Sequence, residues 1–247
     1  MNTVAIVLGI IIVILLYVLY DYFMNKASTL QVNSVHLKTV PPPIPGSSIT
    51  SPTSTRYAYG LWVYVNSWNV GQHTLLERPG NFKIYLDVNT PTLKCDITMT
   101  DGATDSIRTL QITDNFPLQK WTQIIISVDN QYVDAYLDGK LLSSQRMYTS
   151  SPSVTMPKPP PDTINSGATN VGAIFIGNSN IPGNASYVPF DTLIANIKRW
   201  DKSPVNPEDA WSSYMRGNGQ SSTTLGSWGA DLTIFKNNIQ NSNYRLF

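Results

Sequence analysis

Short runs of β-branched and aromatic residues, separated by turn-forming residues, fill the chain from Tyr57 onward. The runs recur about every ten residues, a spacing typical of an all-β sandwich or barrel. Residues 82–88 and 92–100 also alternate apolar and polar side chains, as strands with one face on a core do. We therefore predict that residues 57–247 form an all-β sandwich.

The segment "WTQIIISVDNQYVDAYLDGKLL" (residues 121–142) predicts three strands joined by two tight turns. Asp138-Gly139 marks the second turn, because glycine accepts the positive φ that hairpin turns require. The alternation assigns to the core Ile124, Ile126, Val128, Val133, Ala135 and Leu137. It leaves Tyr132, Asp134 and Tyr136 on the opposite face, available to a glycan or to a protein neighbour.

Three further segments depart from the regular strand pattern or extend it. Residues 149–170 are rich in proline, which lacks the amide donor of a sheet interior, so we expect an excursion from the sandwich. Pro207, preceded by Asn206 as N-cap, predicts a short helix that ends before Gly217. The tail offers two more strands around the turn at residues 236–238.

Residues 4–20, "VAIVLGIIIVILLYVLY", carry no charge and no proline. As a helix they would span roughly 26 Å, close to the hydrocarbon thickness of a bilayer. Tyrosine and phenylalanine cluster at residues 17–23, as in an interfacial aromatic belt. No basic residue precedes the segment and no small-residue cleavage site follows it, unlike a signal peptide. We predict a single membrane anchor in residues 1–24 and leave its orientation open.

Residues 25–56 are rich in serine, threonine and proline. Prolines at positions 41, 42, 43 and 45 favour an extended segment without internal hydrogen bonds. We expect a leash that reaches at most roughly 100 Å from the anchor. It would be either a disordered spacer or a strap that lies along a neighbouring protein.

Catalytic patterns are missing from the sequence. Glycoside hydrolysis needs two carboxyl groups placed together, yet Glu77 and Glu208, the only glutamates, fall on different elements. His36 and His73 have no acid or nucleophile nearby in sequence. Cys95 alternates with apolar residues and is expected to be buried and inert. We predict no enzyme, no catalytic residue and no cofactor.

Charge and cysteine content limit the classes of ligand and the cellular compartment that we expect for this chain. The net charge is +1 and no basic run is present, which argues against nucleic acid. A single cysteine permits no intrachain disulfide and points weakly to a reducing compartment. Calcium could be held by loop carboxylates such as Asp101, Asp105 and Asp162, although no spacing singles them out. We therefore predict no metal site and leave calcium open.

Several motifs together resemble the laminin-G-like, concanavalin A-like jelly-roll family over roughly residues 57–219. Trp121 starts a strand, as a Trp does in the family, and a β-hairpin follows. The Tyr-x-Asp-Gly turn that closes this hairpin is formed here by Tyr136, Asp138 and Gly139, followed by Lys140. A Phe-Ile-Gly strand at 175–177, a strand ending in Trp200 and a helix with Pro207, Glu208 and Tyr214 follow. The family often has glycine early in the late strand, where this chain has Thr192 and Leu193. The resemblance implies a jelly-roll sandwich, which in this chain would follow the single transmembrane helix predicted from residues 4–20.

The order of anchor, leash and one lectin-like domain is also similar to virion proteins of large DNA viruses. That architecture implies a non-enzymatic minor capsid protein that tethers the shell to an inner membrane. The expected localisation is therefore a single-pass protein of the virion inner membrane and capsid. A membrane-bound lectin for host or cell-surface glycans is the alternative. Glycan or protein contact would fall to the outward residues Tyr132, Asp134 and Tyr136 and to the loop aromatics Trp68 and Tyr187.

Overall fold

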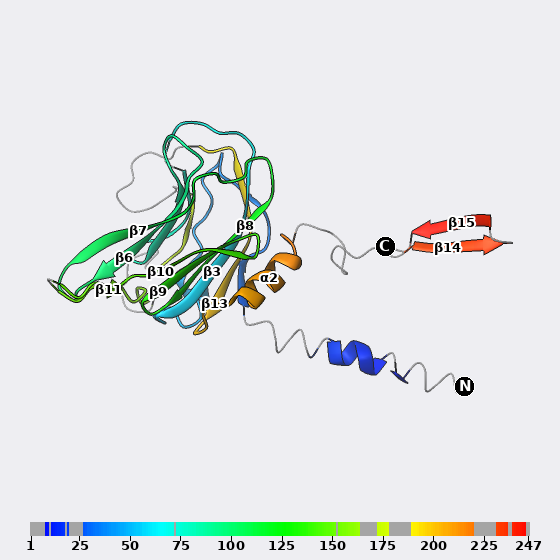
Figure 1. Ribbon diagram of the computed structural model, residues 1–247, viewed down its shortest axis with the longest axis horizontal. Helices are drawn as coiled ribbons and strands as arrows, with labels where there is room; N and C mark the ends of the chain where they lie inside the picture. The colour runs from blue at the N-terminus through cyan, green and yellow to red at the C-terminus, as the bar shows by residue number, and fades with distance from the viewer. Residues whose placement is uncertain are drawn as a thin grey trace.

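The computed structural model describes residues 8–9, 11–17, 19, 27–71, 73–151, 153–163, 172–177 and 189–219, and the backbone of strands at 231–236 and 239–245. Two antiparallel sheets pack face to face in its main body (Figure 1). This arrangement confirms the predicted all-β sandwich.

The first sheet has the order β1-β13-β3-β8-β9-β10, with β2 also paired to β13. Its strands are β1 (Ala27–Gln31), β2 (Val35–His36), β3 (Arg56–Val65), β8 (Thr122–Asp129), β9 (Tyr132–Leu137), β10 (Lys140–Arg146) and β13 (Thr192–Asp201). The second sheet has the order β11-β6-β5-β4-β12, with β7 paired to β6. Its strands are β4 (His73–Arg78), β5 (Phe82–Leu86), β6 (Leu93–Thr100), β7 (Asp105–Thr113), β11 (Met156–Pro157) and β12 (Phe175–Ile176).

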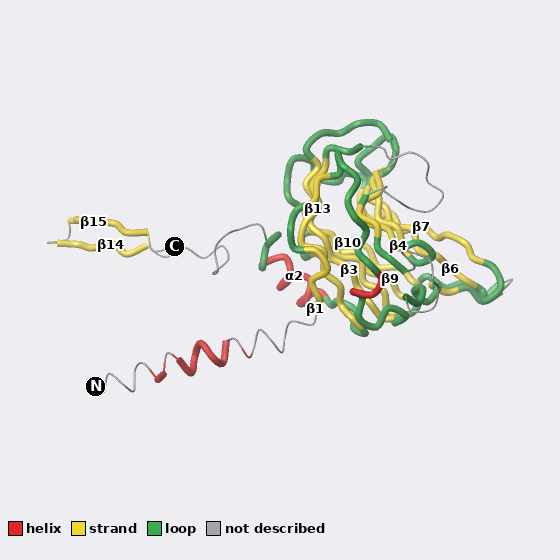
Figure 2. Tube along the Cα trace, turned by 180° about the vertical axis from the view of Figure 1, so that it is seen from behind, coloured by secondary structure: helices red, strands yellow, loops and turns green. Residues whose placement is uncertain are grey.

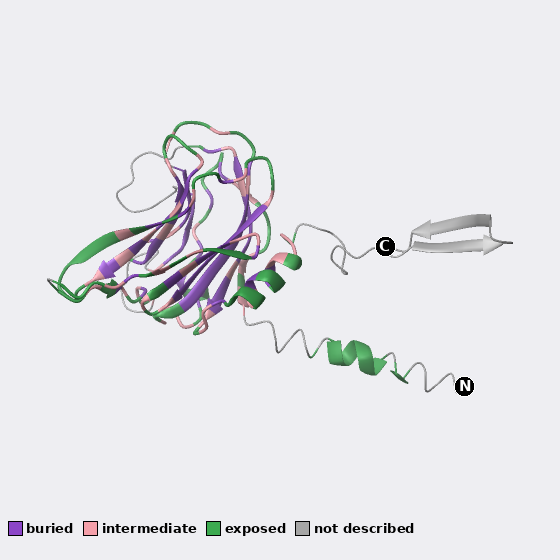
Figure 3. Cartoon of the chain, in the orientation of Figure 1, coloured by how far each residue is buried: buried purple, intermediate pink, exposed green. Residues whose placement is uncertain are grey.

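The core lies between the two sheets, where strand alternation directs the apolar side chains (Figure 3). The predicted core residues of the hairpin at 121–142 are all there, with Leu137 only partly buried. From the second sheet, Phe82, Ile84, Leu86, Leu93, Cys95 and Ile97 face them. The period-two pattern of the sequence therefore located the core correctly on both sheets.

Helix α2 (Pro207–Met215) covers the outer face of the first sheet. Asn206 caps it, because its side chain accepts a hydrogen bond from the Asp209 amide, and Pro207 occupies the first turn. A second apolar cluster lies beneath the helix and consists of Ala58, Ile125, Tyr136, Trp200, Val205 and Ala210. The capped helix was predicted, but its position over Tyr136 was not.

The expected leash at residues 25–56 is in large part woven into the sandwich. Strand β1 pairs with β13 and extends the first sheet, and β2 pairs with β13 further along. Leu37, Ile44 and Ile49 are at most 5% exposed and belong to the central core. These few apolar side chains, spaced between prolines, attach the segment to the domain, so it does not form a free spacer.

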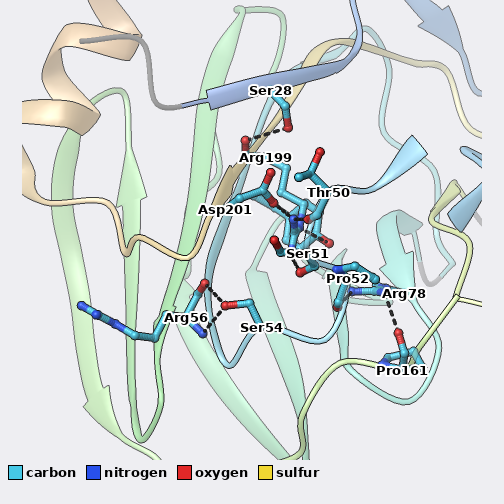
Figure 4. Close-up of polar contacts among 11 residues, drawn as sticks. Ser28, Thr50, Ser51, Pro52, Ser54, Arg56, Arg78, Pro161, Arg199 and Asp201 are labelled. Atoms are coloured by element: carbon cyan, nitrogen blue, oxygen red, sulfur yellow. Dashed lines mark hydrogen bonds and ion pairs between the residues drawn. The ribbon is translucent and has the colours of Figure 1, made fainter. Parts of the chain in front are cut away.

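Two buried arginines hold the end of this segment, residues 50–52, from opposite sheets (Figure 4). Arg199 of β13 donates to the carbonyls of Thr50 and Ser51, and it forms an ion pair with Asp201. Arg78 of β4 donates to the carbonyl of Pro52 at 3.0 Å. The segment between β2 and β3 is therefore fastened to both layers, next to the turn η1 (Gly46–Ser48).

The N-terminal region is helical at residues 8–9, 11–17 and 19, and the rest of the predicted anchor lies outside the described residues. Within the described part of the chain, no helix is both long and apolar enough to cross a bilayer. The large apolar side chains of this helix are 41–70% exposed. They pack on nothing that the structure describes.

The proline-rich excursion and the tail also differ from expectation. Residues 156–157 of the predicted excursion form β11, which pairs with Met99 and Thr100 at the end of β6. Residues 152 and 164–170 lie outside the described set. In the tail, β14 (Asp231–Lys236) and β15 (Ile239–Arg245) are strands as predicted, but they form a two-stranded sheet of their own and do not extend either sheet of the predicted sandwich.

Candidate functional site

Polar side chains form a continuous array on the outer face of the second sheet. The register aligns Phe175, Glu77, Lys83, Asp96 and Thr109 across five neighbouring strands. The adjacent row carries Thr74, Tyr85, Lys94 and Gln111. Directly opposed residues share a face, so these side chains all point away from the core. We call Thr74, Glu77, Lys83, Tyr85, Lys94, Asp96 and Thr109 the polar face.

Asp96 is the hydrogen-bonding centre of the polar face. Its Oδ1 accepts hydrogen bonds from the Tyr85 hydroxyl at 3.2 Å and from the Thr109 hydroxyl at 2.6 Å. The Lys83 ammonium lies 5.5 Å from the centroid of the Tyr85 ring. Cross-strand contacts thus hold a carboxylate, a phenol and an ammonium close together.

Burial perturbs the titration of this face. Burial raises the pKa of Glu77, an effect that Lys83 partly offsets and Asp96 reinforces. Burial, followed by Asp96, raises the pKa of Tyr85 to about 12. Glu77 Oε2 and Thr74 Oγ1 are buried without a hydrogen-bond partner, and Thr74 is only 2% exposed. Both atoms are therefore closed to solvent, and the partly exposed carboxylate of Asp96 is the more accessible group of this face.

The polar face cannot be recognised from the sequence alone. Alternation in residues 82–88 directs Lys83, Tyr85 and Asp87 away from the core, but no local pattern pairs this strand with β4 or β6. The register was the missing information, since strand order and offset bring Glu77 and Asp96 to the same row. Glu77 and Asp96 are two strands apart, with Lys83 between them.

The outward residues predicted on β9 do not form one exposed surface. Tyr132 is 53% exposed and Asp134 is half-buried. Tyr136 is 1% exposed, and its hydroxyl donates to the Val205 carbonyl at 2.9 Å beneath α2. Its assignment as a contact residue therefore needs correction, because the helix covers this part of the sheet.

Trp68 and Tyr187 were the predicted loop aromatics. Trp68 is partly buried and packs edge-on against His73 and Phe190, with ring centroids 5.1 and 6.1 Å away. Tyr187 lies outside the described residues. Trp68 follows the end of β3 at Val65, whereas Tyr132 lies across from the start of β3 at Arg56. The structure therefore does not bring Trp68 and Tyr132 together.

The Asp138-Gly139 pair has a structural role. Both residues have positive φ, 47° and 75°, which confirms the predicted hairpin turn. The Asp138 carboxylate accepts a hydrogen bond from the Gln123 amide at 2.9 Å and pairs with Lys120. A Cβ on Gly139 would lie 3.0 Å from Tyr214 Cβ and 3.1 Å from Trp211 Cα. The glycine thus lets α2 pack onto the hairpin.

The loop carboxylates considered as calcium ligands form hydrogen bonds or ion pairs with nearby protein groups. Asp101 accepts hydrogen bonds from the amides of Ala103 and Thr104, which with other contacts lower its pKa to about 2. Asp105 pairs with Lys158, and Asp162 accepts from the Thr163 amide. Within the described ranges, no three acidic, histidine or cysteine side chains gather as metal ligands would.

Cys95 and the two histidines occupy structural positions. Cys95 is fully buried, as predicted, and burial raises the pKa of its thiol. His73 is 2% exposed and stacks on Phe190, and burial lowers the pKa of its imidazole. His36 Nε2 lies 3.2 Å from Asp191, beside Lys38, which pairs with the same carboxylate.

Comparison with known proteins agrees with this architecture. Residues 43–209, more than half of the chain, match the family described as the concanavalin A-like lectin/glucanases superfamily, in its laminin G form. The chain belongs to this family. The match begins at residue 43, inside the segment expected to be a leash and found in the sandwich. No curated protein matches the chain.

Solved structures match the chain only at low similarity. Trypanosoma rangeli sialidase in complex with sialic acid is 15% identical, with a TM-score of 0.42 over 64% of this chain and 22% of the sialidase chain. The receptor-binding domain of botulinum neurotoxin type G is 14% identical, with a TM-score of 0.42 over 66% of this chain and 38% of that domain. This chain thus spans less than two fifths of the length of either protein.

Proposed function

We propose that the chain is a membrane-anchored, non-enzymatic structural protein whose sandwich docks on neighbouring proteins. In this proposal, residues 4–20 insert into the membrane, and the chain serves as a minor capsid protein of a large DNA virus. The sandwich would then tether the protein shell to the inner membrane of the virion. Tethering of this kind works because one binding event raises the effective concentration for the next.

The observation that carries the proposal is the exposed apolar helix. Residues such as Ile12, Ile14 and Leu16 are 50% exposed or more, on all sides of the helix. A helix that is apolar all round is normally covered by protein or by lipid. The described residues leave it uncovered, so lipid is the occupant that its apolar composition favours.

Flotation of the full chain with phosphatidylcholine vesicles, followed by carbonate extraction, tests the anchor. The full chain should float and should resist extraction, whereas a variant that begins at residue 21 should do neither. Ile14→Asp should weaken the association, while Val70→Asp, on an exposed loop residue of the sandwich, should leave it intact. A full chain that does not float would refute the proposal. Cross-links to shell proteins in purified particles would test the capsid role.

A membrane-bound lectin is the second candidate, and the polar face favours it. Glu77 and Asp96 are partly exposed, two strands apart, and offer carboxylate acceptors to the hydroxyls of a glycan. A glycan array with the full chain should show saturable binding that Asp96→Asn and Glu77→Gln abolish. Glu208→Gln, on the exposed first turn of α2, is the matched control and should change nothing. An array without specific binding would refute the lectin. Hydrolysis of a bound glycan would refute the non-enzymatic part of both proposals.

A further inference from the structure

We infer that the end of the sandwich where β1 begins lies on the bilayer surface and that the opposite end points away from it. We call these the entry end and the distal end. The inference rests on the proposed membrane anchor and adds the surface that meets the lipid. It differs from the expected geometry, in which a leash carried the domain far from the membrane.

The length of chain between the apolar helix and β1 limits how far the sandwich can lie from the membrane. The last described helical residue is Leu19, and β1 begins at Ala27. Eight residue steps span at most about 28 Å even when fully extended. The segment that would have provided a long reach is instead paired with β13 and buried in the core. Ala27 must therefore stay close to the membrane end of the helix.

The register identifies which side chains share the entry end with Ala27. Ala27 pairs with Trp200 at the end of β13, and Arg56 pairs with Asp129 at the start of β3. Asp129 in turn pairs with Tyr132, and Tyr132 with Arg146. One end of the first sheet thus carries all of these residues. The turn at Asp138-Gly139 belongs to the distal end, about 20 Å away along β9 at the usual strand rise.

The exposed side chains of the entry end are those that interfacial regions favour. Tyr132 is 53% exposed, and aromatic rings with a polar tip prefer the headgroup level. Arg146 and Lys202 are exposed cations, and the Arg146 guanidinium donates to the neutral side chain of Gln131 and lies over the Tyr148 ring. Arg56 is neutralised by Asp129 at 2.9 Å. The acidic first turn of α2 limits the net charge nearby, so the contact should not require anionic lipid.

The chain allows a direct test because its one cysteine is buried. Cys95 is fully buried and the pKa of its thiol is raised, so maleimide dyes should not react with it in the folded protein. Thr55→Cys, beside Asn130 at the entry end, and Lys140→Cys, at the distal end, are both exposed labelling sites. Each labelled full chain is bound to phosphatidylcholine vesicles that carry a headgroup acceptor dye, and energy transfer is measured.

Transfer from residue 55 should exceed transfer from residue 140 by at least about twofold, given the added distance of about 20 Å along the strands. Arg146→Glu should lower transfer from the residue 55 label, whereas Lys140→Glu should leave it unchanged. Equal transfer from both sites, or stronger transfer from residue 140, would overturn this inference while the anchor stands. A chain that does not associate with vesicles would overturn the anchor and this inference together.

Discussion

Arg78 and Arg199 donate hydrogen bonds to backbone carbonyls of irregular segments that are removed from water. Backbone carbonyls outside a sheet still need donors when they are removed from water. Arg78 supplies three of them, through hydrogen bonds to Pro52, Pro161 and Gly172 at 2.8–3.1 Å. These carbonyls belong to the N-terminal segment, the proline-rich excursion and the approach to β12. A single guanidinium, with five fixed donors, thus ties three segments to β4.

Replacement of Arg78 by methionine should be strongly destabilising. The buried carbonyls would lose their donors, which should cost about 3 kcal/mol of unfolding free energy. Arg56→Met is the matched control, because the Arg56–Asp129 pair is exposed and should contribute less than about 1 kcal/mol. Urea unfolding of both variants measures the difference. Equal losses would contradict the role assigned to Arg78.

His73 should make stability depend on pH. Burial lowers its pKa from 6.5, so the unfolded chain binds a proton more readily than the folded one. This contribution to stability is fully present above pH 6.5 and is lost as the pH falls from there through the lowered folded pKa. His73→Phe should retain the stacking on Phe190 and show a shallower loss between neutral and mildly acidic pH. Denaturation midpoints measured across this range would contradict the assignment if the two slopes were identical.

At the scale of elements, the β9–β10 hairpin and α2 depend on each other through Gly139. Ala substitution there should cost the positive-φ strain, roughly 1 kcal/mol, plus the overlap with Tyr214 and Trp211, about 1–3 kcal/mol more. Gly80 has almost the same φ, 72° against 75°, and nothing within 4 Å of an added Cβ. The control Gly80→Ala should therefore show the strain alone. Similar unfolding free energies for the two variants would show that α2 does not press on the hairpin.

The N-terminal segment behaves as an element of the sandwich, and Ile49 shows this most clearly. Ile49 is 5% exposed in the central core, whereas Val40 in the same segment is 46% exposed. Ile49→Ala should cost about 2–4 kcal/mol, and Val40→Ala should stay within about 0.5 kcal/mol. Thermal and urea unfolding provide the comparison. A free leash would make both substitutions neutral.

The elements differ in how far sequence could predict them. Alternation was sufficient for β5, β6, β8 and β9, and capping residues were sufficient for α2, because these signals are local. Strand β1 carries no clear alternation, and its pairing with β13 joins residues far apart in sequence. The alternation correctly placed Tyr136 on the outer face of β9. It could not show that α2, some seventy residues later in the chain, covers this side chain. The polar face required the register between β4, β5 and β6, which no local pattern contains.

For the molecule as a whole, the proposed anchor and the sandwich are separated by very little chain. The prolines of residues 41–45 suggested an extended segment that separates the sandwich from the anchor. Instead, Ile44 forms a β-bridge with Ile174, and the Leu37 amide donates a hydrogen bond to the Thr192 carbonyl. The central claim is that the N-terminal segment is part of the domain and that, under the proposed function, it holds the sandwich near the membrane. The family match from residue 43 agrees with the first half of this claim.

Hydrogen exchange of the full chain, read by mass spectrometry, tests that claim most directly. The amides of β1, Leu37 and Ile44 should exchange as slowly as those of β3 and β8, because they are paired within the same cooperative unit. Exchange of residues 27–49 at the rate of an unstructured peptide, with β3 and β8 protected, would contradict the account.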